Sequence, residues 1–526
     1  MTAKGAIAAG NPDTARAAAE ILQAGGNAFD AVLAALCAAC VTEPVLASLG
    51  GGGFLLARPA DGAAVLYDFF TQTPLRPRPA GDTDFYARLA DFGAARQEFH
   101  IGLGSVATPG VVAGLFAAHR DLGSLPMRDI VAPAVAYARD GVRVEALQAF
   151  IIAIVEAIVT ATPAARAMFS RDGGNGALLG EGDTLRMPAL ADALSALADE
   201  GEALFYEGDI ARRIARDCRE GGGHLGADDL AAYEVIRRAP LTRDYRGNRL
   251  LTNPPPSSGG VLIAFALDLL GRSDLAGLGF GAARHLDLLA RVMAETNRAR
   301  IEARIHDLPA DEVADRLLDP GLLARYADEV HGQPPSARGT THISVIDGQG
   351  NAAALSVSNG EGSAYVVPGT GIMLNNMLGE EDVNPHGFHN WPPGRRISSM
   401  MAPTLIEGAD GRTVALGSGG SNRIRTAILQ VLVNLLDFGM DLSHAIEAPR
   451  VHFEGGVTNV EHGFDAREVA ALTGMRGDVK TWPDRNMFFG GVHAVTADPA
   501  TDKFAGAGDR RRGGVSAIVG DATSGD

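Results

Sequence analysis

A threonine that follows a polar, Pro- and Gly-rich segment (residues 331–339) opens a predicted β-hairpin. One strand runs over Thr340–Asp347, a glycine loop occupies residues 348–350, and the chain returns over Asn351–Ser358. If Asp347 pairs with Asn351, the register places Ser358 opposite Thr340. The open end of the hairpin then presents two hydroxyl groups, directly after a segment whose composition is typical of an exposed, cleavable linker.

This pair of hydroxyls suggests nucleophilic catalysis. A threonine hydroxyl is a weak nucleophile and needs an adjacent base. Cleavage of the Gly339–Thr340 bond would free the α-amino group of Thr340, and such amines titrate at about 7.7–8.0 in reference peptides. One residue would then supply both nucleophile and base. The alternative is that the two hydroxyls only stabilise the sheet, as such cross-strand pairs often do.

The elements that must position Thr340 fall into two kinds. Helices alternate with glycine-rich turns over the first two-thirds of the chain, and strands gather after residue 340, which favours a layered α+β fold. Helices are expected at 12–24, 28–41, 111–119, 127–139, 147–161, 190–200, 209–220, 285–305 and 424–438. Besides the hairpin, strands are expected at 54–56, 371–374, 404–407, 413–417, 492–496 and 515–519.

Composition excludes several classes of function. The net charge of −17 offers no basic surface to nucleic acid. The three cysteines give no disulfide framework, and Cys37 and Cys40 are expected to be buried on one helix face. No histidine pattern has metal-ligand spacing, so we expect no metal and no other cofactor. We recognise neither a signal peptide nor an apolar stretch long enough to span a bilayer, and therefore expect a cytoplasmic protein without a membrane partner.

Several motifs occur in order along nearly the whole chain. They are AGGNAFDAVLAA, GGGGF, SVATPGVVAGL, FYEG, YRG, PPPSSGG, TTHISVID-GQGNAAALSVS, SSMMAPT and GSGG. With these motifs the chain resembles the γ-glutamyltransferase family of N-terminal-nucleophile hydrolases. The resemblance implies a precursor that cleaves itself at Gly339–Thr340 into a large subunit, 1–339, and a small one, 340–526. The two would stay associated in a four-layer αββα sandwich, and a homo-oligomer of that heterodimer is left open.

The same resemblance assigns catalytic roles. Thr340 matches the nucleophile that forms an acyl-enzyme, released by water or by an amine acceptor. Ser358 matches a position where the family usually has a threonine whose hydroxyl touches the nucleophile. Gly419 and Gly420 match the glycines whose backbone N–H groups form the oxyanion hole, and glycine allows such donors to approach closely. Without the resemblance, residues 417–420 would be interpreted as a turn.

The substrate side departs from the family pattern. Ser398 and Ser399 match the serines that bind the donor's carboxylate, but Phe70 stands where the family has an arginine. Losing such a charged partner costs about 2–5 kcal/mol, so another cation would be required, and Arg396 is one candidate, with Arg395, Arg423 and Arg425 as others. Met377 replaces a glutamine. Glu380 keeps an acidic group that can accept an ammonium, and Asn359 is next to the position of a family asparagine, which is Gly360 here.

Three hypotheses follow. In the first, the enzyme transfers or hydrolyses a γ-glutamyl amide such as that of glutathione. In the second, the chemistry is the same but the amide is not glutamyl, as in relatives that act on oxamate or are acylases, because Phe70 and Met377 make the pocket more apolar. In the third, the chain never matures and serves as a scaffold or binding protein. The intact Thr340, Ser358, Gly419 and Gly420 argue against the third.

Overall fold

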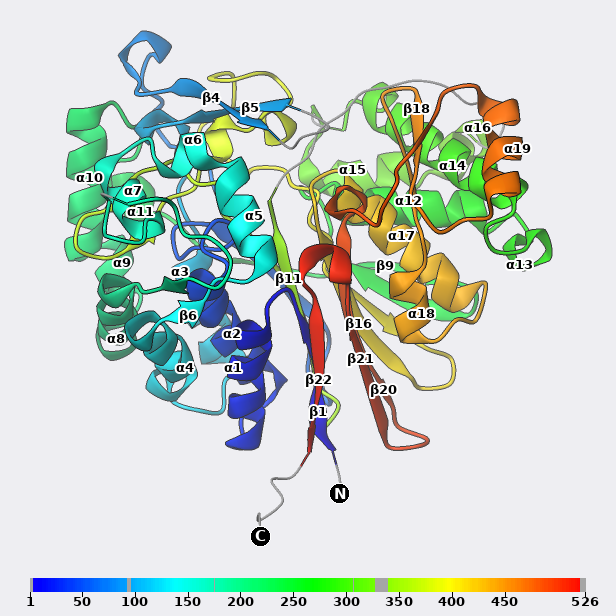
Figure 1. Cartoon of the computed structure of the whole chain (residues 1–526), viewed down its shortest axis with the longest axis horizontal. Coiled ribbons are helices and arrows are strands. Elements are labelled where there is room, and N and C mark those ends of the chain that lie inside the picture. Colours follow the sequence, from blue (N-terminus) through cyan, green and yellow to red (C-terminus); the bar gives the residue numbers. More distant parts are fainter. Residues whose placement is uncertain (1–2, 92–95, 175, 306, 327–338, 521–526) are drawn as a thin grey trace.

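Two large β-sheets face each other through the middle of the computed structural model, which describes residues 3–91, 96–174, 176–305, 307–326 and 339–520 (Figure 1). The first sheet, in spatial order, contains β22 (Val515–Gly520), β1 (Ala3–Ala9), β11 (Thr341–Asp347), β12 (Ala352–Ser358), β2 (Gly52–Arg58), β3 (Val65–Phe69) and β8 (Ile236–Arg238). The second contains β21 (Lys503–Gly508), β20 (Gly491–Asp498), β16 (Thr413–Gly419), β15 (Thr404–Glu407), β10 (Asn248–Thr252) and β9 (Leu241–Tyr245). Strands β11 and β12 of the first sheet contact β16 of the second.

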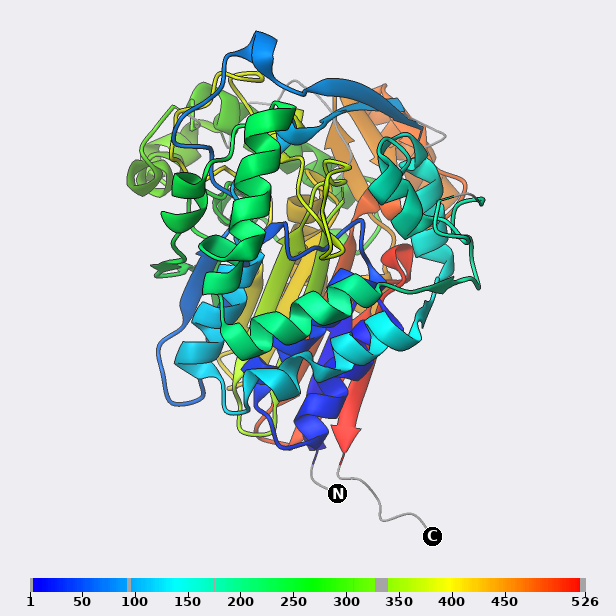
Figure 2. The same cartoon turned by 90° about the vertical axis from the view of Figure 1, so that its left-hand side faces the viewer.

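Short strands form small sheets outside these two. They are β4 (Tyr86–Asp91) with β5 (Arg96–Ile101), β6 (Val142–Arg143) with β7 (Thr184–Leu185), β13 (Val366–Val367) with β14 (Ile372–Met373), and β17 (Val451–Glu454) with β18 (Val457–Val460) and β19 (Val479–Thr481). The β4–β5 hairpin projects at the top of the molecule in Figure 2.

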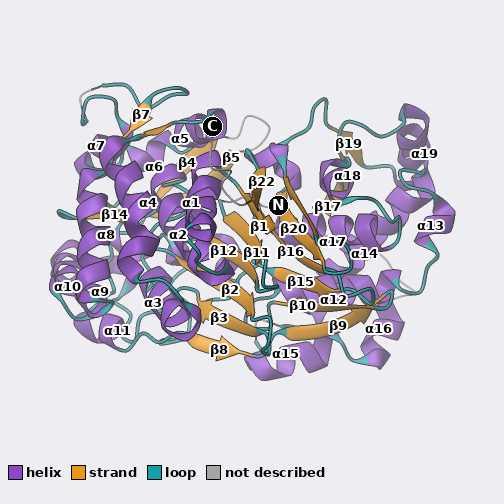
Figure 3. Ribbon diagram, turned by 90° about the horizontal axis from the view of Figure 1, so that it is seen from below, coloured by secondary structure: helices purple, strands orange, loops and turns teal. Residues whose placement is uncertain are grey.

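Helices lie on the outer side of each large sheet (Figures 1 and 3). Beside the first sheet are α1 (Pro12–Gln23), α2 (Ala28–Thr42), α3 (Val111–Leu122), α4 (Met127–Asp140), α5 (Ala146–Ile154), α6 (Glu156–Val159), α7 (Pro163–Phe169), α8 (Pro188–Glu200), α9 (Ala203–Tyr206), α10 (Asp209–Gly221) and α11 (Ala227–Ala231). Beside the second are α12 (Gly259–Leu270), α13 (Leu275–Leu278), α14 (Ala283–Glu302), α15 (Ala310–Leu317), α16 (Pro320–Tyr326), α17 (Arg423–Leu436), α18 (Leu442–Glu447) and α19 (Ala466–Arg476).

Local signals explain the two helices that support the hairpin. The side chain of Asn11 caps α1, and Asn27 with Asp30 forms a reciprocal capping box at the start of α2. Every residue of α2 is buried, because the helix packs on β11 and β12 with one face and on α1 and α4 with others. Cys37 and Cys40 are buried there as free thiols, as predicted.

The prediction that strands gather late was wrong in part. Six strands of the two large sheets precede residue 340, and β1, at the N-terminus, lies between β22 and β11. Its sequence, AKGAIAA, has the low β-propensity of alanine and glycine. Small side chains nevertheless suit this strand, whose last five residues are buried between the second sheet and α1.

Two further boundaries differ from the sequence-based expectation. The helix predicted over 147–161 is two helices, α5 and α6, separated at Val155, where the backbone leaves the helical conformation. The proline-rich composition of residues 251–260 predicts a loop, but the loop is shorter than that, because Leu251 and Thr252 complete β10 and Gly259 begins α12. Residues 331–338 of the predicted linker lie outside the described part of the chain.

Candidate active site

The hairpin formed by β11 and β12 has the predicted register. Thr341 pairs with Val357 and Ile346 with Ala352, which confirms that Ser358 is opposite Thr340. The Asp347 carboxylate fixes the turn, since it accepts hydrogen bonds from the backbone N–H groups of Gln349 and Asn351. It also accepts one from the backbone N–H of Ala28 at the start of α2, at 2.9 Å. A single side chain therefore ties the register to the helix behind the sheet.

Two hydroxyl groups converge on the carbonyl group of Gly339. The Oγ1 atom of Thr340 donates to that oxygen at 2.7 Å, and the Oγ atom of Ser358 donates to it at 2.8 Å. On the other side of Gly339, its backbone N–H donates to Oε1 of Glu361 at 3.0 Å. Gly339 is thus held through both its N–H and its carbonyl, and two hydroxyl donors polarise that carbonyl.

Gly419 lies against Thr340, and Gly420 follows it in the chain. Gly419 ends β16, and a Cβ atom built on it would lie 2.1 Å from the carbonyl oxygen of Thr340. Gly420 has φ +119°, a conformation that residues with a side chain rarely adopt. Close approach at Gly419 and backbone conformation at Gly420 both require glycine, so the β16 end brings bare backbone to Thr340.

A cavity of about 40 Å³ adjoins Thr340. It is lined by Phe70, Gly339, Thr340, Ser358, Met377, Glu380, Asp382, Val383, Ser399, Met400, Met401, Ser421 and Ile424. Of the residues predicted to bind substrate, Phe70, Met377, Glu380 and Ser399 are therefore brought to Thr340. Ser398, Asn359 and Arg396 are not among the lining residues.

Phe70 forms an apolar wall of this cavity. Its ring is 1% exposed and stacks on Phe54, with 5.4 Å between the ring centroids. The backbone around it is fixed, because its N–H donates to Asp68 and its carbonyl accepts from the Tyr233 hydroxyl at 2.7 Å. With Met377 and Met400 beside it, this wall offers thioether and aromatic surface where the resemblance led us to expect a guanidinium.

Arg396 supports the wall from behind. Its guanidinium donates to the carbonyl oxygens of Phe70 and Glu234 and to the Tyr233 hydroxyl. It also lies over the Tyr233 ring and 3.4 Å from the Asp68 carboxylate. These contacts occupy the guanidinium as a structural group, outside the cavity that contains Thr340.

The other arginines considered for the substrate are also placed elsewhere. Arg423 is buried and pairs with Glu454, while Arg425 donates to Asn297 at 2.5 Å. Burial, reinforced by Arg300, lowers the pKa of Arg425 to about 9. Arg395 is exposed and lines a neighbouring cavity.

That neighbouring cavity, of about 650 Å³, shares Val383 with the Thr340 cavity. Ser398 lines it and donates to the carbonyl of Pro256 at 2.9 Å. Trp391 lines this neighbouring cavity as well and is not among the residues that line the Thr340 cavity. Asn359 is fully buried below Ser358, where its backbone N–H donates to Leu46.

Comparison with known proteins assigns the family. The family model described as gamma-glutamyltranspeptidase matches residues 14–519. The chain belongs to the γ-glutamyltranspeptidase family. The glutathione hydrolase proenzyme of Escherichia coli (strain K12) is 32% identical over 88% of this chain and 83% of its own length. The acylase ACY 1 proenzyme of Pseudomonas sp. (strain V22) is 32% identical over 94% of this chain and 90% of its own.

A solved structure shows the same fold. The crystal structure of cephalosporin acylase from Bacillus halodurans superposes with a TM-score of 0.85, covers 98% of this chain and 96% of its own, and is 24% identical. The mixed helix-and-sheet architecture of this γ-glutamyltranspeptidase-family chain is therefore that of an N-terminal-nucleophile hydrolase, and the family membership supports an enzyme of that class.

Three residues near Thr340 were not singled out from the sequence: Glu361, Asp382 and Ser421. Glu361 contacts Gly339, and Ser421 donates to Asp382 at 2.7 Å at the cavity's edge. Ser421 has φ +55°, which turns the chain directly after the glycine pair. Each of the three lies within two residues of a predicted site residue, and this proximity in the sequence was the signal by which they could have been found.

Within the described residues, no group of three or more potential ligand side chains could hold a metal ion. The helices in this part of the chain are also too short or too polar to span a membrane.

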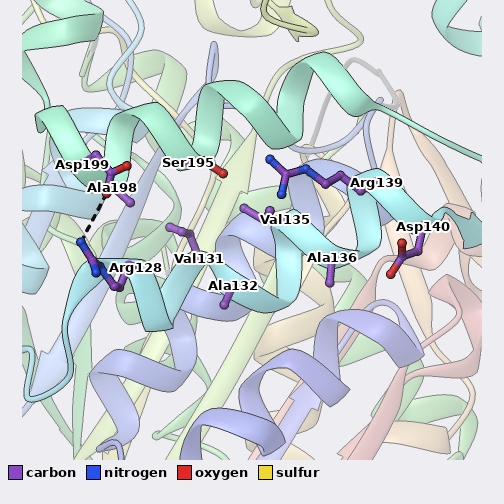
Figure 4. A pocket seen from close by; sticks show the side chains of 10 residues that line it. All are labelled: Arg128, Val131, Ala132, Val135, Ala136, Arg139, Asp140, Ser195, Ala198 and Asp199. Atoms are coloured by element: carbon purple, nitrogen blue, oxygen red, sulfur yellow. Dashed lines mark ion pairs between the residues drawn. The ribbon is translucent and has the colours of Figure 1, made fainter.

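A second hollow, lined by none of the residues around Thr340, serves as a comparison. It lies between α4 and α8 and has an apolar floor that includes Val131 and Val135 (Figure 4). Arg128 and Asp199 form an ion pair at its edge, at 3.5 Å. Ser195 of α8 brings a hydroxyl to the hollow, and this hydroxyl donates to the carbonyl of Ala191 in the same helix. None of these groups is arranged as a nucleophile with a base.

Proposed function

We propose that the chain cleaves itself between Gly339 and Thr340, and that Thr340 then serves as the nucleophile of an amide-bond hydrolase or acyltransferase. The observation that carries this proposal is the convergence of the Thr340 and Ser358 hydroxyls on the Gly339 carbonyl. Gly419, whose backbone lies against Thr340, adds the donor surface that developing negative charge requires.

Self-cleavage would proceed as an acyl shift. The Oγ1 atom of Thr340 attacks the carbonyl carbon of Gly339, the bond from that carbon to the Thr340 nitrogen breaks, and the nitrogen takes up the proton that Oγ1 releases. Water then hydrolyses the ester and leaves a carboxylate on Gly339 and a free α-amino group on Thr340. Both large sheets contain strands from each side of this bond, so subunits 1–339 and 340–526 would remain together. We infer that they form the four-layer αββα sandwich.

In turnover, the new amine accepts the proton of the Thr340 hydroxyl as Oγ1 attacks the substrate amide. The N–H groups of Gly419 and Gly420 stabilise the oxyanion, and the leaving amine takes the proton as the carbon–nitrogen bond breaks. Water or an acceptor amine then releases the acyl group. The Ser358 hydroxyl, which would lose its Gly339 partner after cleavage, remains available to Thr340.

For the acyl group, the cavity favours an amide without a carboxylate at its far end. No arginine or lysine occurs among the described residues that line it, and Phe70 and Met377 are apolar. The similarity to an acylase proenzyme over 94% of the chain supports this choice. A γ-glutamyl donor is the second candidate, because Ser399 and Glu380 are in place for its polar groups.

Three p-nitroanilides test the acyl group, with Thr340→Ala as the blank. Butyryl, glutaryl and γ-glutamyl anilides have acyl chains of similar length that carry no charge, a carboxylate, or a carboxylate and an ammonium. We expect wild-type protein to separate into two bands on a denaturing gel and to turn over the butyryl compound fastest. A γ-glutamyl rate more than tenfold higher than the butyryl rate would establish the second candidate. One persistent band without turnover would show a non-maturing scaffold instead.

A further inference from the structure

Two consecutive arginines after β21 have opposite environments. Arg511 pairs with Glu461 at 2.6 Å and with Asp509 at 3.1 Å, and it donates to two backbone carbonyls. Arg512 is 6% exposed, yet its guanidinium makes no hydrogen bond or ion pair with any residue that the structure describes, and its Nε atom is fully buried. An unpaired buried charge is costly, so its retention suggests a role beyond stability.

The Arg512 guanidinium lies on the glycine pair beside Thr340. A Cβ atom built on Gly420 would lie 2.9 Å from Nη2, and one built on Gly419 would lie 3.4 Å from Nη1. The same Cβ position on Gly419 is 2.1 Å from the Thr340 carbonyl oxygen. Gly491 leaves room for the stem of the arginine, because its Cβ would lie 2.6 Å from Cδ. The cation therefore lies close to the backbone of Thr340, with Gly419 between them.

A buried carboxylate contacts Thr341, the residue that follows the proposed nucleophile. The Oε2 atom of Glu43, at the end of α2, accepts a hydrogen bond from the hydroxyl of Thr341 at 2.8 Å, and Oε1 accepts one from Thr14 at 3.1 Å. Burial raises the pKa of Glu43 to about 7, against these hydrogen bonds and the attraction of Arg512. Burial lowers the pKa of Arg512 to about 10. The charge of each group shifts the pKa of the other, although the two make no hydrogen bond or ion pair.

Other charged groups face this pair from every neighbouring element. Arg423 of α17 opposes the charge on Arg512, whereas Asp509 and Glu361 favour it. His493 of β20 lies close to Gly10 together with Glu43, and burial lowers its pKa to about 4, so it is neutral near pH 7. Cys40 is also near Glu43, and burial keeps it a neutral thiol by raising its pKa.

We propose that Arg512 and Glu43 are positioning residues that set the charge of the Thr340 α-amino group through their opposite charges. The inference rests on the proposed function of Thr340. The Arg512 cation disfavours the ammonium form and so keeps the amine available as a base near neutral pH. The Glu43 anion favours the ammonium form, and its own protonation as the pH falls through about 7 removes that effect. Neither residue touches the reacting atoms.

The pH dependence of kcat/KM for matured enzyme tests this pair, because its acidic limb follows the ionisation of the free amine. Arg512→Met should move that limb up by about one pH unit, the order of shift that a nearby unit charge produces. Glu43→Gln should move it down by less, because Glu43 is itself partly protonated near pH 7. Arg512→Lys keeps the charge and should restore the wild-type limb. Arg510→Gln, an exposed neighbour in the same turn, is the matched control and should change nothing.

If Arg512→Met and Glu43→Gln move the acidic limb in opposite directions, their role is electrostatic. A merely structural role would lower the rate equally at all pH values. The proposal is overturned if Glu43→Gln has the wild-type limb, or if both variants move it in one direction. If Arg512→Met fails to mature, Glu43→Gln and Arg512→Lys still decide. Failure of the proposed function would be seen separately, as wild-type protein that stays uncut or as activity that survives Thr340→Ala.

Discussion

The Thr340 cavity has two walls of different construction. The proposed catalytic wall consists of Thr340 and Ser358, which line the cavity, with Gly419 packed against Thr340 and Gly420 next to it in the chain. The proposed acyl wall consists of Phe70, Met377, Glu380 and Ser399. On the catalytic wall, backbone groups and the hydroxyls of short side chains make the polar contacts. Gly419 is packed so closely that a side chain there would meet the Thr340 backbone. On the acyl wall, side chains provide the surface, and Phe70 stands where the resemblance led us to expect a cation. If the proposed function holds, the catalytic half of the site is the constrained one and the acyl half the more variable one.

The largest effect is expected where the catalytic wall has least space. Gly419→Ala places a methyl group 2.1 Å from the Thr340 carbonyl oxygen and must displace β16 or the nucleophile. We expect self-cleavage and kcat to fall by about 10²–10³-fold, the range found when an oxyanion donor is lost. Gel densitometry and p-nitroaniline release measure both. Gly474→Ala, with nothing within 4 Å, is the control, and equal rates in the two variants would contradict the constraint.

The buried charge behind the catalytic wall has a stability consequence. The pKa of Glu43 is about 7 in the folded chain against 4.5 ordinarily, so folding favours its protonated form. Its contribution is fully present below pH 4.5 and is lost as the pH rises through 7, by roughly 3 kcal/mol.

Urea unfolding of uncut Thr340→Ala protein at pH 5 and pH 8 measures this loss. Adding Glu43→Gln should abolish it, whereas adding Glu20→Gln, at an exposed site on α1, should leave it in place. If the loss were equally large in protein that carries Glu43→Gln, the pH dependence would belong to other groups.

Ser358 tests the polar half of the same wall. Ser358→Ala removes one of the two donors to the Gly339 carbonyl and should slow self-cleavage by about 10–100-fold, the value of a hydrogen bond in a buried site. Ser358→Thr, which keeps the hydroxyl, should recover most of the rate. Ser195→Ala, in the hollow of Figure 4, should have no effect on a cleavage time course. Unchanged cleavage in Ser358→Ala would leave Thr340 without the proposed partner.

The acyl wall should respond with the smallest change in rate but with altered specificity. Phe70→Arg introduces a cation at the cavity and should raise the ratio of γ-glutamyl to butyryl turnover by about tenfold. Phe70→Leu keeps an apolar wall and should leave the ratio near the wild-type value. If the two variants gave the same ratio, the charge at this position would not govern acyl selection.

Sequence reasoning predicted the catalytic wall better than the acyl wall, for a physical reason. Hairpin register follows from the loop length and from Asp347, all within about twenty residues, so the opposition of Thr340 and Ser358 could be predicted locally. Phe70, Met377 and Ser399 could be matched by resemblance, but adjacent Ser398 faces a different cavity. Arg396 could not be assigned, because its partners Phe70, Tyr233 and Glu234 are distant in sequence.

By itself, the sequence determined the hairpin, most helices, the family resemblance and the nucleophile proposed here, because these depend on local periodicity, turn chemistry and short motifs. Only the tertiary structure placed β1 in the first sheet, set Gly419 against Thr340 and separated the roles of Arg511 and Arg512. These two arginines are consecutive in the chain, and what distinguishes them is which distant groups surround each guanidinium. Burial and charge act through space, so Thr340 acquires its surroundings only when the two sheets pack.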